Sequence, residues 1–323
     1  MAKYVGSVAL RNDLKELMVE SPWGDVEFMA DKILTPISVK EQTGYIPKLP
    51  TSAGMKLLDL KREPRGTFQR GMWVWGASLY ATFEYGYEEP IDNVEKLKNA
   101  DIFNEEVVST QIAEHQLKLA REKRVADAVY NTTTFTGAAN TTTITEEWDD
   151  KTNADPYANI TTGAAAMKTK CGAPRKTLHL LMNDVILRNI MRSDAVRSDI
   201  KYTKSIDELS EENQAALLTN FLGIKKIHVA TSFYDTTNLG VEDATFSDIW
   251  SNEYMMLFVP APNAQSWKVP GLGRQPVWSK FAPDYRVEAY DEPQTDSRIV
   301  RVREYRSEFI NTKYGHLFTN CTT

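Results

Sequence analysis

Residues 43 to 89 carry an apolar pattern that constrains the fold more than any other part of the sequence. One half runs from Tyr45 to Leu60, the stretch 63–66 is Glu-Pro-Arg-Gly, and the return half runs from Met72 to Tyr87. Proline at the second turn position and glycine at the fourth favour a type I turn. Aromatic and β-branched residues on both sides favour strand. The pattern predicts a long two-stranded β-ribbon.

Such a ribbon is not expected to be stable on its own. A lone two-stranded hairpin is only marginally stable in water. Trp73, Trp75 and Tyr80 would in addition bring large apolar surfaces into solvent. The ribbon must therefore be covered, either by the core of its own chain or by a neighbouring copy.

A long helix is predicted over residues 104–130. Asn104 can cap it, and Glu105 and Glu106 suit the positive end of the helix dipole. Its apolar positions repeat at helical spacing: Val108, Ile112, His115, Leu119, Ala126 and Val129. At a rise of about 1.5 Å per residue such a helix spans about 40 Å, which is typical of a structural beam.

The parts before and after this helix differ in character. Residues 1 to about 40 resemble an arm with one short amphipathic helix, marked by Leu10, Leu14, Leu17 and Met18. Residues 131–163 are rich in Thr, Asn and Asp and are expected to be loop or exposed strand.

An α/β unit is expected over residues 174–290. Strands are predicted at 177–182, 224–230 and 254–259, with helices that begin near Asn183 and Ser210, the second ending at Gly223. Gly271 to Pro276 is expected to be a loop. Residues 285–318 return to strand, with Val300 and Val302 on one face and Arg301 and Arg303 on the other.

Charge and composition exclude several classes of protein. The 323 residues carry a formal net charge of −6, which disfavours a strongly basic nucleic-acid binder. No apolar run reaches the roughly 18 residues that cross a bilayer, and no signal peptide is visible. Cys171 and Cys321 form neither a disulfide framework nor a zinc motif, so a reducing cytosol is the expected origin.

No motif for catalysis, cofactor binding or metal binding is present. The four histidines, His115, His179, His228 and His316, form no HExxH pattern. The GxG of residues 271–273 precedes Pro276 and no helix, so it is not a phosphate cradle. The acidic residues at 146–150 lack the spacing of a calcium loop and are expected to be solvated. The arginines of 298–306, together with Glu304 and Glu308, are interpreted as one polar face of a strand.

The order of these elements resembles the major capsid proteins of tailed double-stranded-DNA bacteriophages, the Hong Kong ninety-seven-type fold. Thr43-Gly44-Tyr45-Ile46-Pro47 and the ribbon from Phe68 to Tyr87 resemble the family's extended loop. Residues 101–130 resemble its spine helix, and the segment from Phe309 to Phe318 resembles its closing segment.

The resemblance implies an α+β fold with named parts. These are an N-terminal arm (1–42), an extended β-hairpin loop (43–90), a peripheral domain with the spine helix (91–173), an axial α/β domain (174–284) and a return to the peripheral domain (285–323). It also implies a structural protein without enzymatic activity or cofactor. The ribbon residues expected to contact neighbouring copies are Trp73, Trp75, Tyr80, Phe83 and Tyr85.

The implied assembly is a shell of hexamers and pentamers in the virion, built in the host bacterial cytoplasm around packaged DNA that is not bound sequence-specifically. Because the arm begins at Met1 with no room for a scaffolding segment, a separate scaffolding protein is expected, with a portal and a decoration protein as further partners and no membrane contact. Lys48, Lys56 and Lys61 lie in the ribbon, but no crosslink is predicted.

Two alternatives stay open. An encapsulin-like cargo compartment shares the fold and would enclose protein in place of DNA. A soluble enzyme would need a site assembled from distant residues, such as the acidic stretch 146–150 with His179.

Overall fold

The computed structural model describes residues 27–48, 50, 52–62, 64–71, 74–100, 104–200, 211–238, 243–262, 267, 269–282 and 284–322. The predicted helix at Leu10 to Met18 lies outside these residues, as do Trp73 and Ser210.

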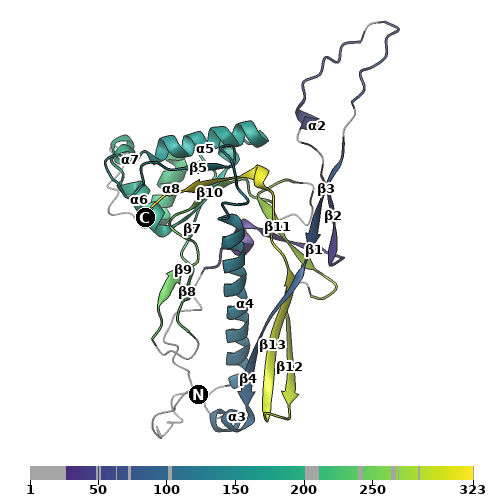
Figure 1. The fold of residues 1–323 in the computed structure, drawn as a ribbon, viewed down its shortest axis with the longest axis vertical. Coiled ribbons are helices and arrows are strands. Elements are labelled where there is room, and N and C mark those ends of the chain that lie inside the picture. The colour runs from purple at the N-terminus through teal and green to yellow at the C-terminus, as the bar shows by residue number, and fades with distance from the viewer. Residues whose placement is uncertain are drawn as a thin grey trace.

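A long limb is formed by one helix and one sheet that run side by side (Figure 1). The helix is α4, Glu105–Val129, and the Asn104 side chain caps it by accepting a hydrogen bond from the Glu106 backbone N–H. The sheet has strand order β1-β11-β13-β12, with β4 also paired to β13 and β14 to β11. The strands are β1 Thr35–Val39, β4 Phe83–Asp92, β11 Gly273–Trp278, β12 Arg286–Glu292, β13 Ser297–Arg306 and β14 Phe309–Ile310.

A second sheet has the order β5-β15-β10-β6-β7, and helices surround it in Figure 1. Its strands are β5 Thr141–Thr143, β6 His179–Asn183, β7 Lys226–Ala230, β10 Met255–Phe258 and β15 Gly315–Thr319. The helices are α5 Pro156–Cys171, α6 Asp184–Arg192, α7 Asp194–Ile200 and α8 Glu211–Leu222. The larger apolar core lies between this sheet and these helices.

The ribbon projects away from both units (Figure 1). Its paired part is β2, Thr43–Lys48, against β3, Gly76–Ala81, and α2, Ser52–Met55, lies beyond it. The small remaining elements are α1 Ala30–Ile33, α3 Asn93–Asn99, β8 Phe233–Asp235, β9 Phe246–Asp248 and the short 3₁₀ helices Arg175–Thr177 and Thr312–Tyr314.

Several local predictions are confirmed. The helix predicted over 104–130 is α4. The Asn183 side chain caps α6 by accepting from the Val185 N–H. Gly223 follows α8 with a φ of 63°, the left-handed conformation that glycine adopts without strain. Val300 and Val302 are buried while Arg301 and Arg303 are half-exposed.

The predicted return strand of the ribbon is wrong as one continuous element. It divides at Thr82, which is buried and whose hydroxyl donates to the Gln42 carbonyl. Beyond that point Phe83 and Tyr85 belong to β4, where they pair with Arg306 and Glu304 of β13. Alternation along a strand determines which side chains share a face, but it does not determine which strand will be the partner.

The loop predicted for Gly271 to Pro276 is also wrong, because Gly273 begins the buried strand β11. A Cβ at Gly273 would lie 2.3 Å from the Phe309 carbonyl oxygen, so glycine is required there by close backbone approach. The loop predicted for 131–163 ends early, since α5 begins at Pro156 behind an Asp155 cap. Within it, Trp148 is fully buried.

The apolar face predicted for the long helix is buried only near the end of the helix, at Ala126 and Val129. Val108, Ile112, His115 and Leu119 are half-exposed. The deepest positions in this half of α4 are Ser109, Ala113, Leu117 and Arg121. Small side chains let the helix approach the sheet closely, so burial follows distance to β4 and β13 and not residue hydrophobicity.

The sheets do not follow the predicted domain ranges. The five-stranded sheet takes β5 from residues 91–173 and β15 from residues 285–323. In turn β11, from residues 174–284, lies in the sheet of the limb.

Candidate self-assembly surface

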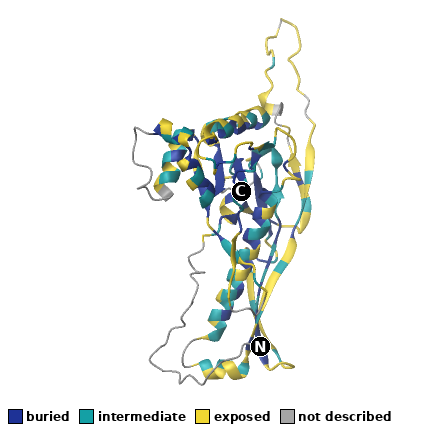
Figure 2. Cartoon of the chain, turned by 60° about the vertical axis from the view of Figure 1, so that its left-hand side comes forward, coloured by how far each residue is buried: buried dark blue, intermediate teal, exposed yellow. Residues whose placement is uncertain are grey.

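The ribbon and the segment beyond it expose large apolar side chains. Proteins that function as monomers usually bury side chains of this kind. Among the described residues, Leu57 is 97% exposed, Val74 82%, Met55 77% and Trp75 69%. Figure 2 shows an almost continuous run of exposed residues along this projection, while buried residues gather in the body. Exposed apolar side chains of this kind make the projection a candidate interaction surface.

The paired part of the ribbon has two different faces. Tyr45 and Leu79 lie opposite one another on the outer face and are 76% and 60% exposed. On the other face Ile46 is buried, and the Tyr80 ring stacks on Trp267 of the same chain with centroids 6.2 Å apart. Of the two faces, the outer one is the face that the described residues of this chain leave exposed.

The ribbon residues singled out from the sequence therefore fall in different places. Trp75 and Phe83 are exposed, Tyr80 is half-covered by its own chain, and Trp73 lies outside the described residues. Tyr85 lies beneath Arg124, whose guanidinium carbon is 3.5 Å from the ring centroid. Sequence reasoning missed Tyr45, Leu57 and Leu79, although the apolar content around Leu57 was the available signal.

A second exposed apolar patch lies at the opposite end of the limb, on α3 (Figure 1). Leu97 is 80% exposed and Val94 is 52% exposed. The Asp92 carboxylate caps α3 by accepting from the Val94 and Glu95 N–H groups. The two patches place uncovered apolar surface at both extremities of the molecule.

A buried ionic cluster holds the limb between these extremities. Glu304 is fully buried on β13 and forms ion pairs with Arg121, Arg124 and Arg306. Arg306 also pairs with Asp31 of α1 at 3.1 Å. The cluster therefore ties α4, β13 and the start of the described chain into one unit.

The Glu122 carboxylate also connects segments that are far apart in the sequence, through hydrogen bonds. Its carboxylate accepts hydrogen bonds from the Met29 and Ala30 N–H groups and from the Trp250 indole, at 2.6–2.8 Å. Ser232 donates at 3.4 Å. Burial raises the pKa of this carboxyl group, while the donors act in the opposite direction.

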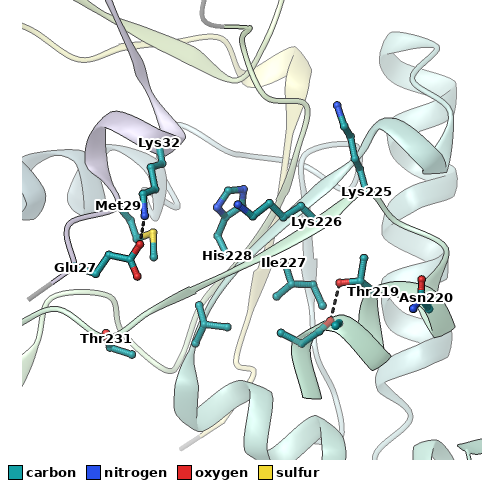
Figure 3. A pocket seen from close by; sticks show the side chains of 13 residues that line it. Glu27, Met29, Lys32, Thr219, Asn220, Lys225, Lys226, Ile227, His228 and Thr231 are labelled. Carbon is teal, nitrogen blue, oxygen red and sulfur yellow. Dashed lines mark hydrogen bonds and ion pairs between the residues drawn. The ribbon is translucent and has the colours of Figure 1, made fainter. Parts of the chain in front are cut away.

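A pocket of about 630 Å³ lies between β7, α8 and the segment before α1 (Figure 3). Lys32, Lys226 and His228 line it, and Lys32 pairs with Glu27. The His228 Nε2 lies 2.9 Å from Nδ1 of His179. Burial lowers the pKa of His228 to about 3 and of His179 to about 4, so both rings are neutral at pH 7.

The described residues that line this pocket include no serine or cysteine that could act as a nucleophile beside His228. Among the described residues no group of three or more His, Cys, Asp or Glu side chains could hold a metal ion. In the acidic stretch 146–150, Asp150 accepts hydrogen bonds from Thr152 and Asn153. The ring of His179, which the alternative enzyme hypothesis placed with this acidic stretch, interacts with the ring of His228.

The sequence is similar to that of a known capsid protein. It is 23% identical over 283 residues to the major capsid protein of Burkholderia phage BcepMu, covering 85% of this chain and 82% of the relative. The chain is a homologue of phage major capsid proteins. No protein-family profile matches it.

The fold of this chain is similar to that of solved capsid structures. A phage-related protein from Bordetella bronchiseptica superposes with a TM-score of 0.66 at 15% identity, covering 91% of this chain and 92% of the other. The capsid of cyanophage P-SCSP1u gives 0.63 at 9% identity, covering 98% and 93%. The fold is the Hong Kong ninety-seven type, with mixed helix and sheet.

The same fold occurs in a virus-like particle from Pyrococcus furiosus, with a TM-score of 0.50 at 12% identity over 92% of this chain and 94% of that chain. Among the described residues of this chain, none of the helices combines the length and the apolar character that a membrane span requires.

Proposed function

We propose that copies of this capsid protein assemble into hexamers and pentamers that close an icosahedral shell around packaged double-stranded DNA. The observation that carries the proposal is the exposed apolar surface of the ribbon, formed by Tyr45 and Leu79 on its outer face and by Trp75 just before β3. Each covered aromatic side chain would contribute about 1.5–3 kcal/mol. Repetition of one modest contact through a shell gives a stable assembly.

The parts of the subunit keep the proposed roles. The limb with α4 is the peripheral domain, the five-stranded sheet and its helices form the axial domain, and the ribbon is the extended loop that lies on a neighbour. Trp73, Trp75, Tyr80, Phe83 and Tyr85 remain the proposed contact residues, and Tyr45, Leu57 and Leu79 join them.

The proposed setting is the virion, with assembly in the host bacterial cytoplasm. We expect no enzymatic activity. Partners besides further copies of the chain are a scaffolding protein, a portal and a decoration protein. The net charge of −6 suits a shell that encloses DNA without binding it tightly.

Electron microscopy of the purified chain, with scaffolding protein where needed, tests the proposal. Capsomers or closed shells are expected, and a monomer under all conditions would contradict it. The alternative, a cargo compartment, is favoured only by the fold shared with the Pyrococcus furiosus particle. Particles that contain protein and no nuclease-protected DNA would favour that alternative.

A further inference from the structure

The strand β7 lies at an edge of the five-stranded sheet. It pairs in parallel with β6 and has no second partner strand among the residues that the structure describes. The Lys225 N–H donates to the Leu178 carbonyl, next to β6. Because backbone groups alternate in direction along a strand, the N–H and C=O groups of Lys226 and His228 point away from β6. An edge with such groups can accept a further strand.

A pocket follows this edge. It is the pocket of about 630 Å³ in Figure 3, which has Glu27 and Met29 on one side and Thr219 of α8 on the other. Ile227 packs in the larger core with residues of α8, whereas Ala230 packs in a second core with Met29. Successive side chains of a strand point to opposite faces. The pocket therefore reaches both faces of β7, which places it at the edge of the strand.

Lysine side chains give this edge a positive charge. Lys32, Lys225 and Lys226 line the pocket, and Glu27 is the only carboxylate among the described residues of its lining. Glu27 is paired with Lys32, whereas Lys225 and Lys226 form no ion pair with a described residue. A second copy that added its own β7 here would bring like charges together, which is unfavourable. An acidic strand would instead be attracted.

We propose that the edge of β7 binds an extended acidic segment of a partner protein, which adds a strand beside Lys226 and His228. Backbone hydrogen bonds would give affinity, and the carboxylates of the segment would select it through the lysines. The open stretch is short, because the Ile249 N–H already donates to the Ser232 carbonyl beyond it. At about 3.3 Å per residue, a segment of about five residues fills it. This inference does not rest on the proposed shell.

Fluorescence anisotropy with the full, unassembled chain tests the proposal. The probe is a fluorescein-labelled peptide of about nine residues in which threonine and glutamate alternate, and it should bind. Lys225→Glu together with Lys226→Glu should weaken binding about tenfold or more. Lys151→Glu together with Lys168→Glu makes the same change of charge at exposed sites outside the pocket and should have little effect. Circular dichroism checks that each variant is folded.

A second probe separates strand addition from attraction between charges. The same peptide with N-methyl groups on alternate backbone amides keeps its carboxylates but cannot pair along the edge, so it should bind about tenfold more weakly. Addition of the unmodified probe should also slow hydrogen exchange at the amides of Lys226 and His228.

Four results would overturn the proposal. They are the absence of binding by the unmodified probe, equal binding by the N-methylated probe, and equal loss of binding in the two double variants. The fourth is slow hydrogen exchange at Lys226 and His228 before any probe is added, which would show that another segment covers the edge. If this protection disappeared on dilution, the covering segment would belong to a second copy.

Discussion

The indole nitrogen of Trp250 donates a hydrogen bond of 2.6 Å to the carboxylate of Glu122, and both side chains are fully buried. Trp250 follows the β8 and β9 pair, while Glu122 lies in the last third of α4. The same carboxylate receives the Met29 and Ala30 N–H groups. One side chain therefore joins α4, the segment that follows the β8 and β9 pair, and the residues just before and at the start of α1.

Replacing this carboxylate should destabilise the subunit strongly. Glu122→Ala would leave several buried donors without an acceptor, and each such donor costs about 1–3 kcal/mol. We expect a loss of at least about 3 kcal/mol in the free energy of unfolding, measured by urea denaturation. Glu146→Ala, at an exposed site, is the control and should change it by less than about 0.5 kcal/mol. Equal stability of the two variants would contradict the role of Glu122.

The ionic cluster on β13 gives a second prediction. Glu304→Ala would leave Arg121, Arg124 and Arg306 facing one another without the central carboxylate. Breaking a buried ion pair in this way costs about 3–5 kcal/mol. Among the described residues Glu308 forms an ion pair with Arg124 alone, and its side chain is partly exposed, so Glu308→Ala should cost much less. Thermal unfolding of both variants measures the difference, and a larger effect at Glu308 would be the contrary result.

The histidine pair predicts a loss of stability in mild acid. The unfolded chain takes up protons near pH 6.5, but the folded pKa values are about 4 for His179 and about 3 for His228. Protons therefore favour the unfolded state as the pH falls from 6.5 toward 4. Lys225, Lys226 and Lys32 strengthen the shifts.

The His179→Gln, His228→Gln double variant should lose less stability than the unaltered chain between pH 6.5 and 4.5. The expected difference is about 4 kcal/mol, or about 2 kcal/mol for each histidine, because each pH unit over which only the unfolded chain takes up a proton corresponds to about 1.4 kcal/mol. Urea denaturation at the two pH values provides the measurement. Parallel losses in both proteins would show that other groups dominate the acid response.

Close packing of α5 on β15 is testable at one glycine. A Cβ at Gly163 would lie 2.4 Å from the tip of the Phe318 ring, which is fully buried. Gly163→Ala should therefore destabilise the fold by about 1–3 kcal/mol. Gly54 on α2 has no atom within 4 Å of the same position, so Gly54→Ala should be neutral or slightly stabilising. Denaturation midpoints of the two variants decide the matter.

Assembly should depend on the outer face of the ribbon more than folding does. Trp75→Ser and Leu79→Ser remove apolar surface that is already exposed in the subunit, so circular dichroism and melting temperature should change little. Particle yield, followed by light scattering and microscopy, should fall sharply. Ser78→Ala, which faces Ile46 on the inner side of the ribbon, is the matched control. Normal particles from the Trp75 and Leu79 variants would refute the role of the outer face.

Local signals predicted some elements well because their causes lie within a few residues. The Asn104 cap, the Asn183 cap and the left-handed Gly223 each satisfy backbone groups that their own helix leaves unpaired. The strands after residue 285 were predictable for the same reason, since alternation of Val300 and Val302 with arginines is a local pattern.

Predictions failed where the environment of a residue depends on residues that are far away in the sequence. Gly273 is in a strand because Phe309 approaches its backbone, and Phe83 leaves the ribbon because Arg306 of β13 pairs with it. Alternation and glycine content contain no information about such partners.

The sequence by itself determined the helix of the limb, the paired base of the ribbon, the mixed α+β class and the absence of recognisable catalytic motifs, since propensity, capping and periodicity act over short distances. The strands predicted around Leu57–Leu60 and at Val74–Trp75 are wrong, because the described residues there form no strand and residues 52–55 form α2. Only the tertiary structure decided which face of α4 is buried, where the ribbon ends and β4 begins, and that Tyr45 and Leu79 share its uncovered side. Those outcomes depend on strand pairing and side-chain packing between segments far apart in the chain, and the free energy of such contacts exists only once the segments meet.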